Sequence, residues 1–93
     1  MRTIERTGQF KRDYKRESKG QHRNVLDESL LAVLELILAD KPLPAKYRDH
    51  PLAGDWADHR DCHIKPDLLL IYRLPDKNAV QLVRLGSHSE LGL

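Results

Sequence analysis

The stretch 56–85 constrains the fold most, because its apolar residues follow the two-residue period of a strand and two turn signals divide it. Pro66-Asp67 predicts a tight turn, and the run 68–74 that follows is apolar on both faces, as a central strand requires. A second turn sequence at 75–78 leads into a further strand at 79–85. Three consecutive strands joined by short turns predict an antiparallel meander.

The first strand of this block separates polar from apolar side chains. His59, Asp61 and His63 fall on one side of the strand, whereas Cys62 and Ile64 fall on the other. We therefore expect the side that carries the imidazoles to lie outside the core. We expect Cys62 to be a small core residue rather than a nucleophile.

The N-terminal half predicts a short strand followed by two helices. Residues 2–7 are typical of a first strand or lead-in, and two aromatic residues four apart within 9–18 predict a helix with a narrow apolar stripe. A second helix is predicted from Asn24, whose side chain would cap it, to about Asp40. Its polar surface is so small that we expect it to be covered nearly all round, by the domain's own sheet or partly by a partner protein.

The remaining elements complete an α+β domain. A long connection at 41–55 follows the second helix, and Ser87 with Glu90 matches a capping box that starts a final helical turn at His88. The predicted architecture is a single domain over residues 1–93, with two N-terminal helices packed on one face of a four-stranded, mainly antiparallel sheet. The other face of the sheet is left open for function.

The composition excludes several classes of protein. The chain has 93 residues, 40% of them hydrophobic and 32% charged, which suits one small core and excludes a disordered chain. A single cysteine excludes an internal disulfide and favours a reducing compartment. The longest apolar run, 30–39, contains Glu35 and is shorter than the ~20 residues that span a bilayer, and residues 1–16 lack the apolar centre of a secretory signal. The sequence therefore predicts a cytoplasmic protein that does not enter membranes.

The net charge of +2 is unevenly distributed along the chain. Residues 1–23 hold eight basic and three acidic residues (+5), residues 24–40 hold four acids and no base (−4), and residues 41–93 hold eight bases and seven acids (+1). The basic N-terminal third can attract a polyanion. A solvated helix face explains the same residues, so charge alone does not establish nucleic-acid binding.

Three histidines and two aspartates are the candidates for chemistry. His50, His63 and His88 come from separate parts of the chain, and Asp61 and Asp67 flank His63 along the predicted strand and turn. Attack of a ribose 2′-hydroxyl on the neighbouring phosphate needs a base, an acid and a cation for the charge on phosphate. Imidazole suits both proton transfers because it titrates near neutrality, and an arginine fork suits the phosphate. Arg84, on the last predicted strand, is the leading candidate for that contact.

Alternative interpretations of these residues remain open. Any single histidine can be an ordinary surface residue, and Asp67 can be only a turn former. His22 lies in a basic linker and is expected at the surface, while His59 is ambiguous. A metal site is not expected, because His59 and His63 on one strand lie ~13 Å apart and Cys62 points to the opposite face. We expect no metal and no other cofactor.

Two segments of the chain resemble a known family. The sequences LPAKYRDHPLAGDWADHRDCHIKPDLLLIYRL (43–74) and VRLGSHSELG (83–92) are similar to the YafQ branch of the RelE-type toxins of bacterial type II toxin–antitoxin modules. The resemblance implies a RelE-like fold and a metal-independent endoribonuclease that enters the ribosomal A site and cuts messenger RNA there, which inhibits translation. It also implies a cognate antitoxin, a ribbon-helix-helix protein of the DinJ/RelB type, that sequesters the toxin.

The resemblance also implies roles for individual residues. The functional positions of the family fall on His50, His63, Asp67 and His88 as catalytic residues, with Asp61 in support and Arg84 as a phosphate contact. Which histidine is the acid and which the base stays open. The branch commonly has an aromatic residue where this chain has Leu68 and a Phe where it has Gly92. Aromatic rings can stack on bases, so both departures bear on RNA affinity.

Two other functions remain as alternatives. One is a non-catalytic toxin of the same fold that binds and poisons a protein such as gyrase. The other is a degenerate member that keeps only antitoxin binding, which the departures at Leu68 and Gly92 motivate. The basic first helix and the apolar second helix suit an acidic antitoxin segment that folds on binding.

Overall fold

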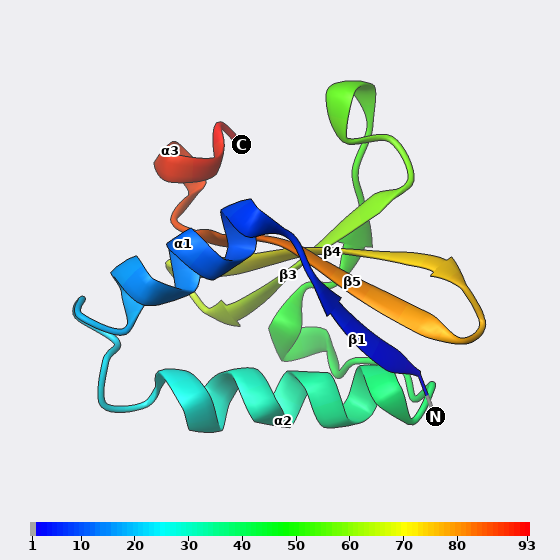
Figure 1. The fold of residues 1–93 in the computed structure, drawn as a ribbon, viewed down its shortest axis with the longest axis horizontal. Coiled ribbons are helices and arrows are strands. Elements are labelled where there is room, and N and C mark those ends of the chain that lie inside the picture. The colour runs from blue at the N-terminus through cyan, green and yellow to red at the C-terminus, as the bar shows by residue number, and fades with distance from the viewer. Residues whose placement is uncertain (1) are drawn as a thin grey trace.

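The structure of the protein, a computed structural model, describes residues 2–93 and is built on a five-stranded sheet with the order β1-β5-β4-β3-β2 (Figure 1). The N-terminal strand forms one edge of the sheet, and three consecutive strands form an antiparallel meander at its centre. The strands are β1 (Thr3–Arg6), β2 (His50–Pro51), β3 (His59–Lys65), β4 (Leu68–Asp76) and β5 (Ala79–Gly86).

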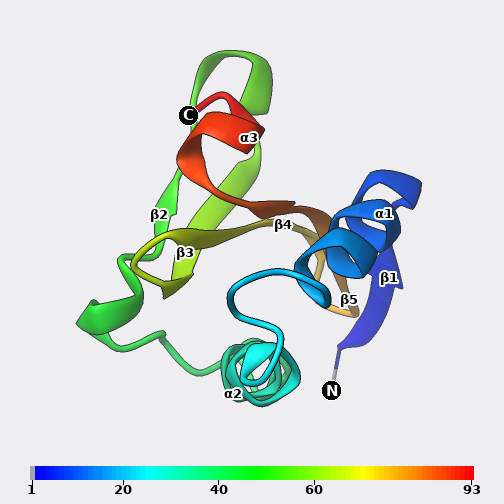
Figure 2. The ribbon, with the colours of Figure 1, turned by 90° about the vertical axis from the view of Figure 1, so that its left-hand side faces the viewer.

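Three α-helices and two 3₁₀ turns surround this sheet. Figure 2 shows one long helix end-on beneath the sheet, the short C-terminal helix above it, and the N-terminal helix beside β5 and β1. The helices are α1 (Gly8–Glu17), α2 (Leu26–Leu38) and α3 (His88–Leu91), and the 3₁₀ turns are η1 (Ala45–Tyr47) and η2 (Gly54–Trp56). None of the helices between residues 2 and 93 is long and apolar enough to cross a membrane.

The predicted meander is confirmed, but the sheet is larger and less uniform than expected. The strands β3, β4 and β5 pair antiparallel in sequence order, as the pattern predicted. The expectation of four strands is wrong, because His50 and Pro51 form a fifth strand, β2, opposite Asp61 and Arg60. A two-residue strand is too short to give a periodic signal. The sheet is also mixed, since β1 pairs parallel to β5.

The main core lies between the sheet and α2. The apolar stripe of α2 packs against the faces of β3, β4 and β5 that point downward in Figure 1. Cys62 is fully buried in this core, as predicted. The buried members of the cluster are Phe10, Leu26, Leu30, Val33, Leu34, Ile37, Cys62, Ile64, Leu68, Leu70, Tyr72, Val80, Leu82 and Leu85.

The opposite face of the sheet is not entirely open. Leu69, Ile71 and Leu91 form a second, smaller buried cluster there, against which Leu52, Trp56 and Val83 are packed. Asp61, which we expected outside the core, is buried beside this cluster. The expectation of a free face therefore needs correction, because α3 and the loop before β3 cover part of it.

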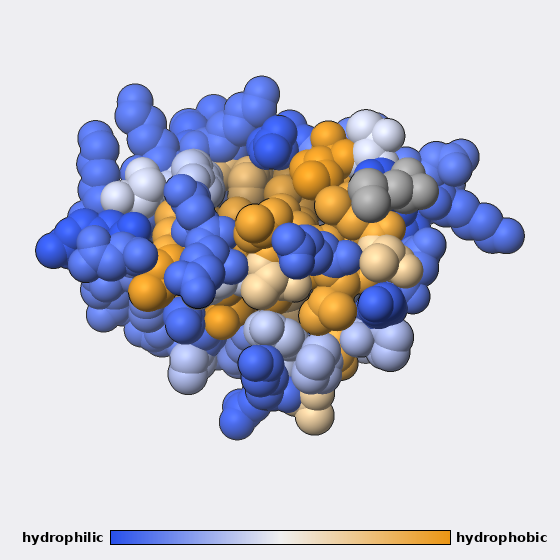
Figure 3. Space-filling model, turned by 90° about the horizontal axis from the view of Figure 1, so that it is seen from below, coloured by the Kyte–Doolittle hydropathy of each residue, from blue (hydrophilic) through white to orange (hydrophobic). Residues whose placement is uncertain are grey.

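The predicted start of α2 is wrong. The helix begins at Leu26 with Val25 at the cap, where no side chain among residues 2–93 caps it, so Asn24 is not its N-cap. The domain itself does not cover the helix all round, because Leu31 is 54% exposed, so cover by a partner protein stays a prediction. Only one side of α2 meets the sheet, and Figure 3 shows a broad apolar area at the centre of the face seen from below, within a hydrophilic rim.

The helix α1 closes the edge of the sheet that β1 leaves open. Parallel pairing with β1 ends at Leu82, so the outer backbone groups of Val83 and Leu85 have no neighbouring strand. Side chains of α1 and its cap take the place of a strand: Thr7 donates to the Val83 carbonyl (2.8 Å), and Arg16 donates to the Leu85 carbonyl (2.8 Å). Unpaired edge groups promote association with other chains, and here they are satisfied within the domain.

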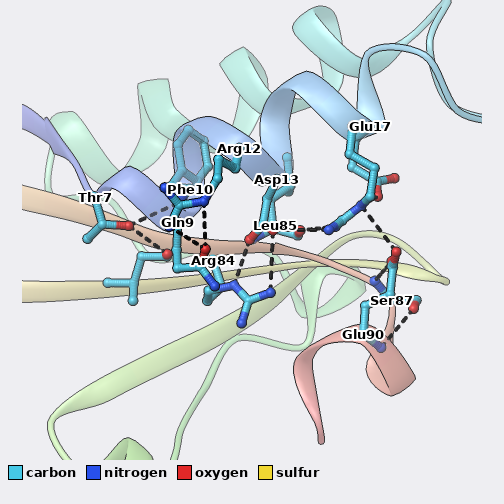
Figure 4. Close-up of polar contacts among 12 residues, drawn as sticks. Thr7, Gln9, Phe10, Arg12, Asp13, Glu17, Arg84, Leu85, Ser87 and Glu90 are labelled. Carbon is cyan, nitrogen blue, oxygen red and sulfur yellow. Dashed lines mark hydrogen bonds and ion pairs between the residues drawn. The ribbon is translucent and has the colours of Figure 1, made fainter.

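The carboxylate of Asp13 completes this edge (Figure 4). Its Oδ2 accepts the backbone N–H of Leu85 (3.0 Å) and Nε of Arg84 (2.7 Å), and its Oδ1 accepts Nη1 of Arg16 (3.1 Å). Only 4% of the Asp13 side chain is exposed. Burial raises the pKa of Asp13. The hydrogen bonds from Arg84 and Leu85 and the two guanidinium charges lower it by a larger amount, so the pKa falls below its ordinary value.

The short helix α3 is fixed to this network from the other side. The predicted capping box is confirmed, because Ser87 accepts the Glu90 N–H and the Glu90 carboxylate accepts the Ser87 N–H. Glu90 also pairs with Arg16 of α1 (3.1 Å). This pair passes over Gly86, where an added Cβ would lie 2.8 Å from the Arg16 guanidinium, so a side chain at this position would displace it.

We expect Asp13→Asn to lower the free energy of unfolding by about 2 to 3 kcal/mol, because it breaks a buried charge pair whose arginines still reach water. The effect depends on pH. Since the folded protein lowers the pKa of Asp13, its stabilisation is present above about pH 4 and is lost as the pH falls below that value.

Urea unfolding of the parent, of Asp13→Asn and of the exposed control Asp55→Asn between neutral and acidic pH measures this difference. The parent and Asp13→Asn should converge in acid, and Asp55→Asn should follow the parent throughout. Equal stability of the parent and Asp13→Asn at neutral pH would contradict the assignment.

Candidate active site

A row of polar side chains crosses the sheet opposite the main core. The strand register aligns His50 of β2 with Asp61 of β3, Asp61 with Ile71 of β4, and Ile71 with Arg84 of β5. The row therefore brings together residues that are up to 34 positions apart in the chain. It joins three of the predicted site residues in one line.

Two further predicted residues meet beside this row. His63 lies two positions beyond Asp61 on β3, and α3 brings His88 against it, so that the two rings are 5.3 Å apart and meet edge to face. The imidazoles of His50, His63 and His88 are all near enough for their charges to act on Asp61. The structure thus places three imidazoles from β2, β3 and α3 around one carboxylate.

Asp61 is the buried centre of this cluster. Its side chain is 4% exposed, and among residues 2–93 its Oδ1 accepts no hydrogen bond. Nδ1 of His50 lies 3.3 Å from this oxygen. Burial raises the pKa of Asp61 above its ordinary value, although the charges of His50, His63 and His88 oppose this rise. An unsatisfied buried acceptor among imidazoles is suited to hold protons on them.

A short loop network positions His50. The His50 Nδ1 lies 2.8 Å from the carbonyl of Arg48, whose backbone is held in the left-handed region at φ 50°. The neighbouring Asp49 accepts Nη2 of Arg60 (2.9 Å) and the hydroxyl of Tyr72. Burial and the bond to Asp49 raise the pKa of that hydroxyl. The segment before β2 is therefore tied to β3 and β4.

Sequence analysis missed Asp49 as a positioning residue. It lies in the connection 41–55, where no periodic pattern assigns a face to any side chain. Its one signal is position, because it directly precedes His50. Its two partners, the guanidinium of Arg60 on β3 and the hydroxyl of Tyr72 on β4, cannot be identified from the sequence of the loop.

Arg84 lies in the row, but Asp13 already occupies part of its guanidinium. Nε and Nη2 of Arg84 both donate to the Asp13 carboxylate, at 2.7 and 3.3 Å. The guanidinium therefore ties α1 to β5, and Nη1 is the nitrogen left for a phosphate. The phosphate contact of Arg84 stays a prediction.

Asp67 is turned away from the three imidazoles. Its two oxygens accept Nε2 of His22 (2.8 Å) and Nε2 of Gln21 (2.6 Å), both in the linker between α1 and α2. Burial raises the pKa of Asp67, but the hydrogen bonds from His22 and Gln21 and the charge of His22 together lower it below its ordinary value. His22, expected as a plain surface residue, has a side chain only 17% exposed. The catalytic role of Asp67 stays a prediction.

The positions that depart from the YafQ pattern have clear structural roles. Leu68 is 1% exposed in the main core, so its side chain does not reach the site face. Gly92 has φ 72° and ends α3 in the left-handed region, which glycine adopts without strain. Of the two neighbouring leucines, Leu91 is buried and Leu93 is 40% exposed, so Leu93 is the one available for apolar contact.

Cation-binding chemistry has no cluster to support it in the described part of the chain. Between residues 2 and 93, no three His, Cys, Asp or Glu side chains are arranged to hold a metal ion.

Comparison with known proteins gives the class and the family of this chain. The small α+β domain with its site on the sheet face belongs to the bacterial toxins of type II toxin–antitoxin systems. Specifically, the model of the family described as "Bacterial toxin of type II toxin-antitoxin system, YafQ" matches residues 2–92, so the chain belongs to the YafQ family. The resemblance found in the sequence is thereby confirmed.

Relatives and solved structures agree with this membership. A protein of Escherichia coli strain K12 named mRNA interferase toxin YafQ is 43% identical over 91 residues, which cover 98% of this chain and 96% of the relative. The crystal structure of YafQ from Escherichia coli BL21(DE3) is similar with a TM-score of 0.82 at 37% identity, over 98% of both chains. YafQ in the Escherichia coli DinJ–YafQ complex gives a TM-score of 0.79 at 35% identity, also over 98% of both chains.

We expect Asp61→Asn to raise the melting temperature at about pH 8, because a neutral amide is easier to bury than an unpaired carboxylate. The folded protein raises the pKa of Asp61, so its ionisation costs stability as the pH rises through that value. The advantage of the variant should therefore grow from acidic to alkaline pH.

Thermal denaturation across that pH range, with Asp55→Asn as the exposed control, measures the advantage. If Asp61→Asn melts below the parent at about pH 8, the carboxylate is better satisfied than its geometry indicates.

Proposed function

We propose that this protein is the toxin of a type II toxin–antitoxin module and acts as an endoribonuclease on messenger RNA. The observation that carries the proposal is the arrangement of His50, His63 and His88 around the buried Asp61. Membership of the YafQ family and the name mRNA interferase of a relative at 43% identity support it.

The proposed reaction is transfer of a phosphoryl group within the RNA. One neutral imidazole accepts the proton of a ribose 2′-hydroxyl while the 2′-oxygen forms a bond to phosphorus. The bond from phosphorus to the 5′-oxygen breaks, and an imidazolium donates a proton to that oxygen. The proton taken up thus replaces the one given out, and no metal or cofactor enters the balance.

The geometry suggests how roles divide among the residues. The rings of His63 and His88 are 5.3 Å apart and meet edge to face, so both can reach one scissile linkage from the same side. Asp61 stabilises whichever imidazole carries the proton, because its Oδ1 is a buried acceptor with no hydrogen-bond partner among residues 2–93. His50 is the further proton-transfer residue. Arg84 through Nη1, and Asp67 once released from His22, complete the proposed set.

The proposed setting is the A site of the small ribosomal subunit, where the toxin cuts the message and inhibits translation. The segment 1–23 carries a charge of +5, which attracts a polyanion such as ribosomal RNA.

The proposed partner is a cognate antitoxin of the ribbon-helix-helix, DinJ/RelB-like class. A YafQ relative in Escherichia coli forms a complex with DinJ. In this chain an apolar groove of about 400 Å³ lies between α1 and α2, with Leu31 exposed at its side. The groove is lined by Arg6, Phe10, Tyr14, Asp27, Leu30, Leu31, Leu34 and Leu82. Apolar surface of this kind fits a segment that folds on binding.

We expect His63→Asn and His88→Asn to lower the rate of message cleavage by about 10²- to 10⁴-fold, the usual contribution of a general acid or base. His59→Asn is the matched control, because His59 packs on Trp56 outside the pair of rings. Mapping of the cut ends of a defined message in a reconstituted translation system gives the rates.

Cleavage at the parent's rate by His50→Asn, His63→Asn and His88→Asn alike would remove the assignment. Intact message together with inhibited DNA supercoiling would favour a toxin that acts only by binding protein.

We expect Leu31→Gln to weaken antitoxin binding by at least about tenfold, because it removes the most exposed apolar side chain beside the groove. Titration of the toxin with the purified antitoxin measures the affinity. Leu74→Gln is the matched control, since Leu74 is 40% exposed at a different surface. Equal affinities for both variants would place the antitoxin elsewhere.

A further inference from the structure

A second groove, of about 600 Å³, runs along the free edge of β3. The strand β2 pairs with β3 only at Arg60 and Asp61, so the outer edge of β3 beyond Asp61 has no neighbouring strand. The first turns of α2 and the turn η1 form the other walls. The groove is lined by Val25, Glu28, Ser29, Ala32, Lys46, Tyr47, Arg48, His63, Ile64, Lys65 and Pro66.

The charges in this groove favour an anionic ligand. Lys46, Arg48 and Lys65 contribute three cations, and Glu28 is the one acid among the lining residues. Within residues 2–93, none of the three cations takes part in an ion pair. The Lys46 ammonium lies over the ring of Tyr47, 5.1 Å from its centroid, so an aromatic surface and a cation stand together in the wall.

The groove is continuous with the candidate active site. His63 lines the groove and also contacts His88, so one end of the groove opens at the paired rings. Arg48 lines the groove, and its carbonyl oxygen lies 2.8 Å from Nδ1 of His50. The left-handed backbone at Arg48 is therefore held where the groove and the histidine cluster meet.

We propose that this groove binds the single-stranded RNA segment that adjoins the scissile phosphate. Lys46, Arg48 and Lys65 contact successive phosphates, and Tyr47 offers a ring to a base. This inference rests on the proposed ribonuclease function and extends it, because it gives the path of the RNA outside the reacting linkage. A strand whose phosphate lies at His63 and His88 has to continue over adjacent surface, and this groove begins at His63.

An acidic protein segment is the competing occupant. A free strand edge can accept an extended peptide through backbone hydrogen bonds. RNA is favoured because the groove shares His63 with the histidine cluster, and because the apolar groove between α1 and α2 suits a protein partner better. The experiment below separates the two.

The test measures binding of a short single-stranded RNA whose 2′-hydroxyls are methylated, so that cleavage does not contribute. Fluorescence anisotropy gives the affinity of the purified toxin over a series of salt concentrations. The variant carries Lys46→Gln, Arg48→Gln and Lys65→Gln. The matched control carries Lys41→Gln, Arg73→Gln and Lys77→Gln, which remove the same charge from residues outside both the groove and the basic segment 1–23.

The groove variant should bind at least about tenfold more weakly at low salt, and the slope of log K against log salt should fall by about 2, since each single-strand phosphate contact contributes ~0.7. The control variant should keep the parent's slope. Because the methylated RNA cannot be cut, this binding result is independent of the proposed chemistry and can fail or succeed separately from it.

Three results would overturn the inference. They are absence of salt-dependent RNA binding by the parent, an equal loss in the groove and control variants, or an unchanged RNA affinity in the groove variant. If the groove variant binds RNA normally but loses affinity for the purified antitoxin, the occupant is an acidic protein segment. A parent that binds this RNA but cuts no message would instead remove the proposed function and leave the groove as a binding site.

Discussion

The buried carboxylate of Asp13 holds together parts of the fold that hydrophobic packing alone does not connect. Its bonds to the Leu85 N–H and to Arg84 supply what a neighbouring strand would have supplied to the open part of β5. Arg16 extends the same network to Glu90 at the start of α3. The position of His88 therefore depends on a helix that lies beyond the edge of the sheet.

Register connects the core of the protein to its site. A shift of one residue in β3 would move Asp61 and His63 into the main core and expose Cys62 on the other face. In β5 the pairing register shifts between Ile71 and Tyr72 of the partner strand, so Leu82 and Leu85 both reach the core although they are three positions apart. This irregularity also aligns Arg84 with the row of site residues.

Periodic patterns predicted the strands and the buried side of β3, because a two-residue alternation with turn residues at both ends has few other solutions. The same reasoning could not find β2, which has two residues, or the role of Asp13, which from spacing is one more charge on a basic helix. The site was predicted in part: His50, His63 and His88 converge, whereas Asp67 pairs with a linker histidine whose position no local pattern encodes. Such contacts join distant segments and depend on how the elements pack.

Asp13 and Asp61 are both buried aspartates, but they have opposite effects on the stability of this domain. Both are 3% exposed, yet the folded protein lowers the pKa of Asp13 and raises that of Asp61. The difference is the supply of donors, since Asp13 accepts from two arginines and a backbone N–H while Oδ1 of Asp61 accepts none among residues 2–93. A buried carboxylate that accepts hydrogen bonds from several donors stabilises the fold and does not readily accept a further proton. A buried carboxylate that lacks such donors lowers stability, and it can still accept hydrogen bonds or protons from the imidazoles around it.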